Sequence, residues 1–153
     1  MGLDMFAYAV KGEEATGAPL PSLEEWNAIY DKHPAEEFYY WRKHPDLHGW
    51  MENLYHTRGG GETFNCTPMR LYPEDLDALE KDIMSRALPH TEGFFFGQSH
   101  SNDAKGDLEF IEKARERIDE GYYVYYESWW LIGLMVTTTC LNLLTSVGNV
   151  LVS

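Results

Sequence analysis

The chain has 153 residues, 44% of them hydrophobic and 24% charged, which is enough apolar material for one folded domain and excludes a largely disordered chain. There are 25 acidic residues against 12 Lys and Arg, a net charge of -13, so broad electrostatic binding to nucleic acid is excluded too. The two cysteines, Cys66 and Cys140, are too few for a disulfide framework and form no C-x-x-C pair for zinc. A reducing, cytoplasmic location is the simplest expectation.

The pattern of apolar residues, punctuated by Gly and Pro, predicts elements in the order β-α-α-α-β-α-β-α-β. Ser22 followed by two glutamates is a typical helix start, and Pro45 and Pro73 stand at first helical positions. The predicted strands cover 3–10, 64–71, 94–96 and 122–128, and the predicted helices cover 23–31, 35–43, 46–56, a segment from 73 to before 89, and a segment around 108–118 that ends at Gly121.

This order favours a single α+β domain over residues 1–129, with a mixed sheet of about four strands packed with helices. Residues 130–153 form an apolar tail. The 24 positions from 129 to 152 carry no charge and 15 of them are apolar, which is long enough to span a bilayer. Interspersed Thr, Asn and Ser residues and the lack of flanking Lys or Arg favour instead buried β-structure or an appended extension.

Familiar catalytic and nucleotide-binding signatures are absent from the chain. It has no G-x-x-x-x-G-K-[ST], no G-x-G-x-x-G after the first strand, no H-E-x-x-H and no G-x-S-x-G. No cofactor is therefore expected.

The segment 38–50, FYYWRKHPDLHGW, places aromatic and basic residues around a proline that interrupts two predicted helices. Cations beside a new helix start predict a pocket for a small anion, and aromatic rings could stack on a base or sugar. The alternative is that the cations satisfy the last carbonyls of a helix and the aromatic residues form the core. The expected ligand-binding residues are Trp41, Arg42, Lys43, His48 and Trp50, and His48 is also the candidate general acid or base.

Two further constellations involve the same histidine. His48, Glu52 and His56 recur every four residues and carry the donor types that zinc or iron prefers, although each step of four rotates them by about 40° around the helix. A solvated helix flank is the simpler interpretation, so no metal site is assigned. Cys66 could likewise act as a nucleophile beside a histidine such as His48, but a lone cysteine in a strand is more often a small core residue.

Several short motifs occur together in a familiar order: Gly2-Leu3-Asp4-Met5, Tyr40-Trp41-Arg42-Lys43, His48-x-Trp50, Phe94-Phe95-Phe96-Gly97 and Tyr126-x-Ser128-Trp129. Over residues 1 to about 129 the chain resembles a family of small proteins found in bacteriophage genomes and some bacteria. Its members are often labelled phosphoglycerate kinase, a much larger two-lobed enzyme whose nucleotide lobe has no counterpart here. This chain departs from the family at His44-Pro45, where Ala-Asn is common, and continues beyond the usual end.

Three hypotheses for function follow from these features and from the resemblance. The first is a phage-type accessory protein that binds a small anionic ligand or a host factor without chemistry. The second is a small enzyme that acts on a phosphorylated or nucleotide substrate, with His48 and Arg42 at its centre. The third is a module that forms homo-oligomers or associates with a membrane through residues 130–153. A phage protein would work in the host cytoplasm.

Overall fold

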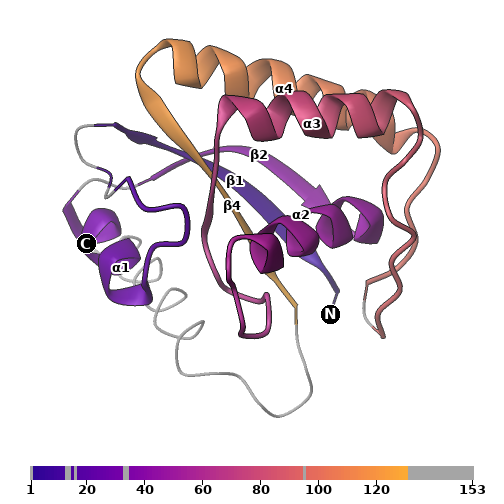
Figure 1. Cartoon of the computed structure of the whole chain (residues 1–153), viewed down its shortest axis with the longest axis horizontal. Helices are drawn as coiled ribbons and strands as arrows, with labels where there is room; N and C mark the ends of the chain where they lie inside the picture. Colours follow the sequence, from indigo (N-terminus) through magenta and orange to yellow (C-terminus); the bar gives the residue numbers. More distant parts are fainter. Residues whose placement is uncertain (1, 13–14, 16, 33–34, 95, 131–153) are drawn as a thin grey trace, which may run out of the picture.

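The computed structural model describes residues 2–12, 15, 17–32, 35–94 and 96–130 (Figure 1). The predicted tail over 130–153 therefore lies outside the described residues, except for Trp130. The elements in chain order are β1 (Asp4–Lys11), α1 (Leu23–Lys32), β2 (Glu36–Arg42), α2 (Pro45–Thr57), β3 (Met69–Leu71), α3 (Pro73–Met84), α4 (Asp103–Asp119) and β4 (Tyr122–Trp129).

The four strands form one sheet in the order β2-β1-β4-β3, which confirms the α+β class and the expected number of strands. Every pairing is antiparallel, so the mixed sheet expected from the sequence is wrong in that detail. The register places Met5 opposite both Trp41 and Ser128, and Ala7 opposite Tyr126.

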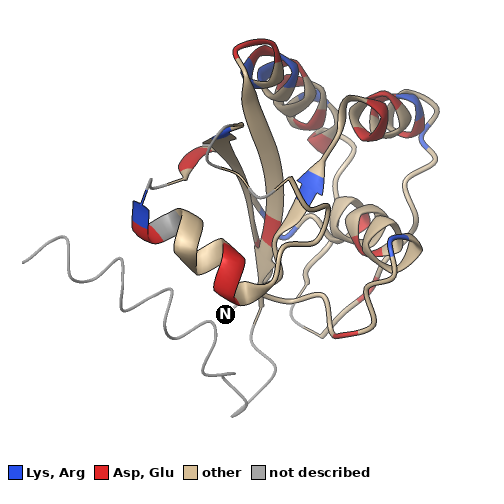
Figure 2. Ribbon diagram, turned by 60° about the vertical axis from the view of Figure 1, so that its left-hand side comes forward, with Lys and Arg blue, Asp and Glu red and all other residues tan. Residues whose placement is uncertain are grey.

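The helices cover the two faces of the sheet unequally. α1 lies on one side of the sheet, and α2, α3 and α4 lie on the other (Figure 2). Alternation along β1 sends Met5 and Ala7 into the main core beneath α2, α3 and α4, whereas Val10 packs with Trp26 of α1. The covering of both faces explains why this strand is apolar on both sides.

Four of the predicted helices are confirmed within a few residues of their expected ends. Ser22 caps α1 as expected, because its Oγ accepts the Glu25 N–H at 3.1 Å while the Glu25 carboxylate accepts the Ser22 N–H at 2.7 Å. Proline occupies the first turn of both α2 and α3. None of the helices in the described part of the chain has the length and apolarity needed to cross a membrane.

Three other expectations are wrong. The helix predicted over 35–43 is the strand β2, because its run of aromatic residues suits a pleated surface paired with β1 better than a helix. Of the strand predicted over 94–96, the described residues Phe94 and Phe96 lie in a turn, and Phe94 is 96% exposed. The strand predicted over 64–71 keeps only Met69–Leu71, and Cys66 ahead of it has a left-handed backbone with φ of 54°.

Candidate functional site

The two tryptophans predicted to stack on a ligand are instead tied to helices. Trp41 of β2 is buried, and its indole Nε1–H donates to Asp107 Oδ1 of α4 at 3.1 Å. Trp50 of α2 donates its Nε1–H to Asp82 Oδ2 of α3 at 2.8 Å. Both rings therefore serve the packing of the helices on the sheet.

The predicted cations lie away from these rings. Arg42 is the next residue after Trp41 in the strand, so it points to the opposite face, where its Nε lies 4.0 Å from Asp4 Oδ1 and its side chain is 55% exposed. Lys43 follows the strand with a left-handed backbone (φ 55°), and its side chain is exposed.

His48 is a core residue. Its ring is fully buried, stacks on Phe64 at a centroid distance of 5.5 Å, and places Nδ1 2.9 Å from the Tyr126 hydroxyl. Burial lowers the pKa of His48 from 6.5 to about 4, because the imidazolium would lose its hydration. The structure therefore does not bring His48, Arg42 and Lys43 together around a hollow.

The structure does not gather the residues considered for a metal into a metal site. The Glu52 carboxylate lies 3.8 Å from His48 Nε2 and 4.0 Å from His56 Nε2, the spacing of ion pairs along one helix flank. Within the part of the chain that the structure describes, no group of three or more His, Cys, Asp or Glu residues could hold a metal ion.

A different histidine occupies the proline-interrupted corner. His44 immediately precedes α2, is only 4% exposed, and has a partner on each ring nitrogen. Its Nδ1 lies 2.7 Å from Ser99 Oγ, and its Nε2 lies 2.8 Å from Asp107 Oδ2. Both distances are those of good hydrogen bonds, so the three side chains form a continuous chain from serine to aspartate.

The hydrogen bonds that link Ser99, His44 and Asp107 run in a definite direction. Asp107 is fully buried and accepts the Trp41 indole N–H on its other oxygen, which makes it the acceptor for His44 Nε2–H. The neutral imidazole then has its lone pair on Nδ1, directed at Ser99. The Ser99 hydroxyl donates its proton to that nitrogen, and its oxygen accepts the Asp46 backbone N–H at 3.0 Å.

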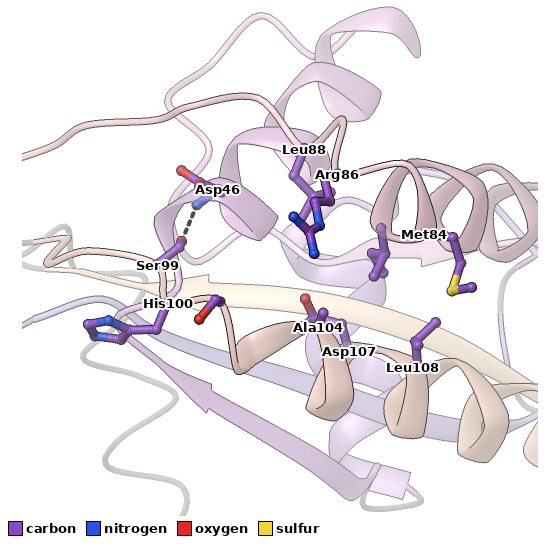
Figure 3. Close-up of a pocket in the computed structure, with 11 residues that line it drawn as sticks. Asp46, Met84, Arg86, Leu88, Ser99, His100, Ala104, Asp107 and Leu108 are labelled. Atoms are coloured by element: carbon purple, nitrogen blue, oxygen red, sulfur yellow. Dashed lines mark hydrogen bonds between the residues drawn. The ribbon is translucent and has the colours of Figure 1, made fainter.

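Ser99 also reaches the surface, which His44 and Asp107 do not. Its side chain is half-buried and lines two neighbouring cavities that share Ser99 and Asp46. The first cavity, of about 510 Å³, lies between the end of α3 and the start of α4, and Figure 3 shows the Asp46–Ser99 bond at one end of it. The second cavity, of about 690 Å³, is bounded by the start of α2 and by residues 90–94 and 97–99.

Nucleophilic catalysis needs an accessible hydroxyl, a base in hydrogen-bond contact with it, and a third group that holds the base in the right tautomer. Ser99, His44 and Asp107 meet these three geometric conditions. Of these three residues, only His44 could be noticed in the sequence, because it belongs to the basic cluster beside Pro45. Ser99 belongs to a loop without a distinguishing pattern.

The position of Asp107 in the sequence is also informative. It lies three and four residues before Phe110 and Ile111, in phase with the buried face of α4. A carboxylate at an apolar position of a helix requires a buried partner, which could have drawn attention to it.

Comparison of the chain with protein-family models, with curated proteins and with solved structures gives no match. The comparisons therefore leave the resemblance to the phage family as an expectation from the sequence motifs.

Proposed function

We propose that the protein is a small ester hydrolase in which Ser99 is the nucleophile, His44 the general base and Asp107 a positioning residue. The observation that carries this proposal is the unbroken hydrogen-bonded chain from a cavity-lining hydroxyl to a buried carboxylate. The proposal keeps the enzyme hypothesis drawn from the sequence, but it moves the chemistry from His48 and Arg42 to residues that the fold assembles.

The reaction follows from the direction of the hydrogen bonds. Ser99 Oγ attacks the carbonyl carbon of the ester, a C–O bond forms, and the hydroxyl proton passes to His44 Nδ1. The bond to the leaving alcohol breaks, and the alcohol takes that proton, which leaves an acyl group on Ser99. Water then attacks the acyl group and gives a proton to His44, and Ser99 regains that proton as the acid departs. The net reaction converts ester and water to acid and alcohol.

The surroundings of His44 support both of its protonation states. Asp107 holds the neutral ring with Nδ1 free to accept a proton. When Nδ1 gains the proton, the imidazolium has a second carboxylate close by, since Asp103 Oδ2 lies 3.6 Å from Nδ1. The ring is reversed relative to serine proteases, in which Nε2 faces the serine, but either nitrogen can act as the base once the opposite partner fixes the tautomer.

Steady-state hydrolysis of 4-nitrophenyl butyrate by the full chain tests the proposal. We expect Ser99→Ala to lower kcat/KM by roughly 10³-fold or more, because the acyl-enzyme can no longer form. Ser101→Ala is the matched control, since Ser101 lines the same first cavity but makes no hydrogen bond to His44, and it should retain activity. Hydrolysis by Ser99→Ala at the wild-type rate would disprove the proposal.

A further inference from the structure

Arg86 supplies a cation to the first cavity beside Ser99. The residue follows the end of α3, and Figure 3 shows its side chain reaching from that segment into the cavity toward α4. Its backbone is left-handed, with φ of 57°, at the position after a helix end where glycine is usual. A residue other than glycine is disfavoured in this conformation, and the Arg86 side chain lines the cavity.

The Arg86 side chain is also distinguished by what it does not contact. The other five arginines all have carboxylate or ring partners: Arg42 with Asp4, Arg58 with Asp75, Arg70 with Tyr72 and Tyr123, Arg115 with Asp77 and Glu80, and Arg117 with Glu36. Among the described residues, Arg86 is the one arginine whose side chain has no ion pair, hydrogen bond or ring contact. The molecule has a net charge of -13, yet this exposed guanidinium is paired with none of its carboxylates.

The two carboxylates that line the same cavity form no ion pair with Arg86. Asp107 is fully buried and accepts the N–H groups of His44 and Trp41. Asp46 Oδ1 accepts the backbone N–H of Thr91 at 3.0 Å. The Arg86 guanidinium therefore keeps its donors available on the cavity side, where the planar fork suits two oxygens of a carboxylate or phosphate.

The second cavity lacks a comparable cation. Asp46 and Glu92 contribute carboxylates to its lining, and neither Lys nor Arg occurs among the described residues that line it. Ser99 stands where the two cavities meet. Consider a substrate that binds with its carbonyl at Ser99 and also carries a carboxylate or phosphate. Its anionic group would lie in the first cavity, where the cation is.

We infer that the substrate is an anionic ester, whose carboxylate or phosphate is bound by Arg86 while its carbonyl lies against Ser99. This inference rests on the proposed role of Ser99 and specifies the class of substrate. Arg86 is the specificity-determining residue of the first cavity.

Two pairs of esters test the inference with the full chain. On the acyl side, mono-4-nitrophenyl glutarate is compared with 4-nitrophenyl butyrate, and on the alcohol side, 4-acetoxybenzoate is compared with phenyl acetate. We expect kcat/KM to favour the anionic ester by about tenfold or more in at least one pair, and Arg86→Ala to bring that ratio close to one. Arg86→Lys should keep part of the preference, because it keeps the charge but loses the fork.

Lys105→Ala is the matched control, since it removes the same charge from the exposed surface of α4 outside both cavities and should leave the ratio as in the wild type. Equal rates for both members of both pairs would overturn the inference while leaving the hydrolase proposal intact.

A chain that hydrolyses none of the four esters would instead overturn the hydrolase proposal, and calorimetric titration with glutarate and inorganic phosphate then decides the role of Arg86. Binding of either anion that Arg86→Ala weakens about tenfold or more supports the anion site. Absence of binding, or equal binding by the variant, overturns it.

Discussion

His44 and His48 lie one helical turn apart and are both buried, yet they differ in their hydrogen-bond partners and in their access to a cavity. His44 has a partner on both nitrogens and is separated from a cavity only by Ser99. His48 is enclosed by aromatic rings, and its Nε2 has no hydrogen bond. The sequence could not rank them, because the partners of each come from α4, from β4 and from the loop before α4, which are remote in the chain.

Asp107→Asn tests the direction of the hydrogen bonds around His44. The amide oxygen can still accept from Trp41, but the amide NH₂ then faces His44 Nε2 and favours the tautomer with the proton on Nδ1. That tautomer cannot accept the Ser99 proton, so we expect kcat to fall roughly 10³-fold at nearly unchanged KM. A variant with full activity would show that Asp107 serves only to pack α4.

At the scale of the elements, the sequence predicted the helices better than the strands. The helix starts are encoded locally by Ser22, Pro45 and Pro73, and the structure confirms all three. The segment Glu36–Arg42 was misassigned because its aromatic residues suit a buried helix or a strand equally well, and pairing with β1 decides between them. In a helix, Trp41 and Arg42 would point about 100° apart, whereas in a strand they face opposite ways.

A second feature at this scale is how Thr91 and Ser99 pack against α2. The Asp46 side chain accepts the Thr91 N–H, the Asp46 N–H donates to Ser99, and Gly49 lies directly beneath Thr91. A methyl group on Gly49 would come within 1.9 Å of Thr91 Oγ1 and 2.9 Å of Thr91 Cβ.

We therefore expect Gly49→Ala to lower both the melting temperature and esterase activity, although alanine alone would favour a helix by about 1 kcal/mol. Differential scanning fluorimetry and the butyrate assay measure the two effects. Gly61→Ala is the control, since its added Cβ would meet nothing within 4 Å. A stabilised and fully active Gly49→Ala variant would contradict the close packing of this segment on α2.

At the scale of the whole molecule, two buried ionisable groups, His48 and Glu127, change the stability of the fold in opposite directions as the pH rises. Burial lowers the pKa of His48 to about 4, so protonation of the unfolded chain below pH 6.5 destabilises the fold as the pH falls toward 4. Burial raises the pKa of Glu127 from 4.5 to about 7. The stability that the protonated carboxyl group contributes is therefore fully present below pH 4.5 and is lost as the pH rises toward 7. Each effect is on the order of 3 kcal/mol, and the two nearly cancel between pH 4.5 and 6.5.

Glu127→Gln should separate these contributions. Without the buried carboxylate, we expect the free energy of unfolding in urea to rise from pH 4 to 6.5 and then level off, and to exceed the wild-type value at pH 8. The neutral amide has nearly the same shape, so packing changes little. Identical pH profiles for the variant and the wild type would contradict the burial of a titrating carboxyl group at position 127.

Covalent labelling with a fluorophosphonate tests the role of Ser99 most directly, because an activated serine displaces fluoride and forms a stable phosphonyl ester. Mass spectrometry of the full chain should show one adduct on the peptide that contains Ser99, retained in Ser101→Ala, absent in Ser99→Ala and strongly slowed in His44→Ala and Asp107→Asn. A wild-type chain that acquires no adduct, or one that is labelled equally fast after either His44 or Asp107 is replaced, would contradict a catalytic serine at this site.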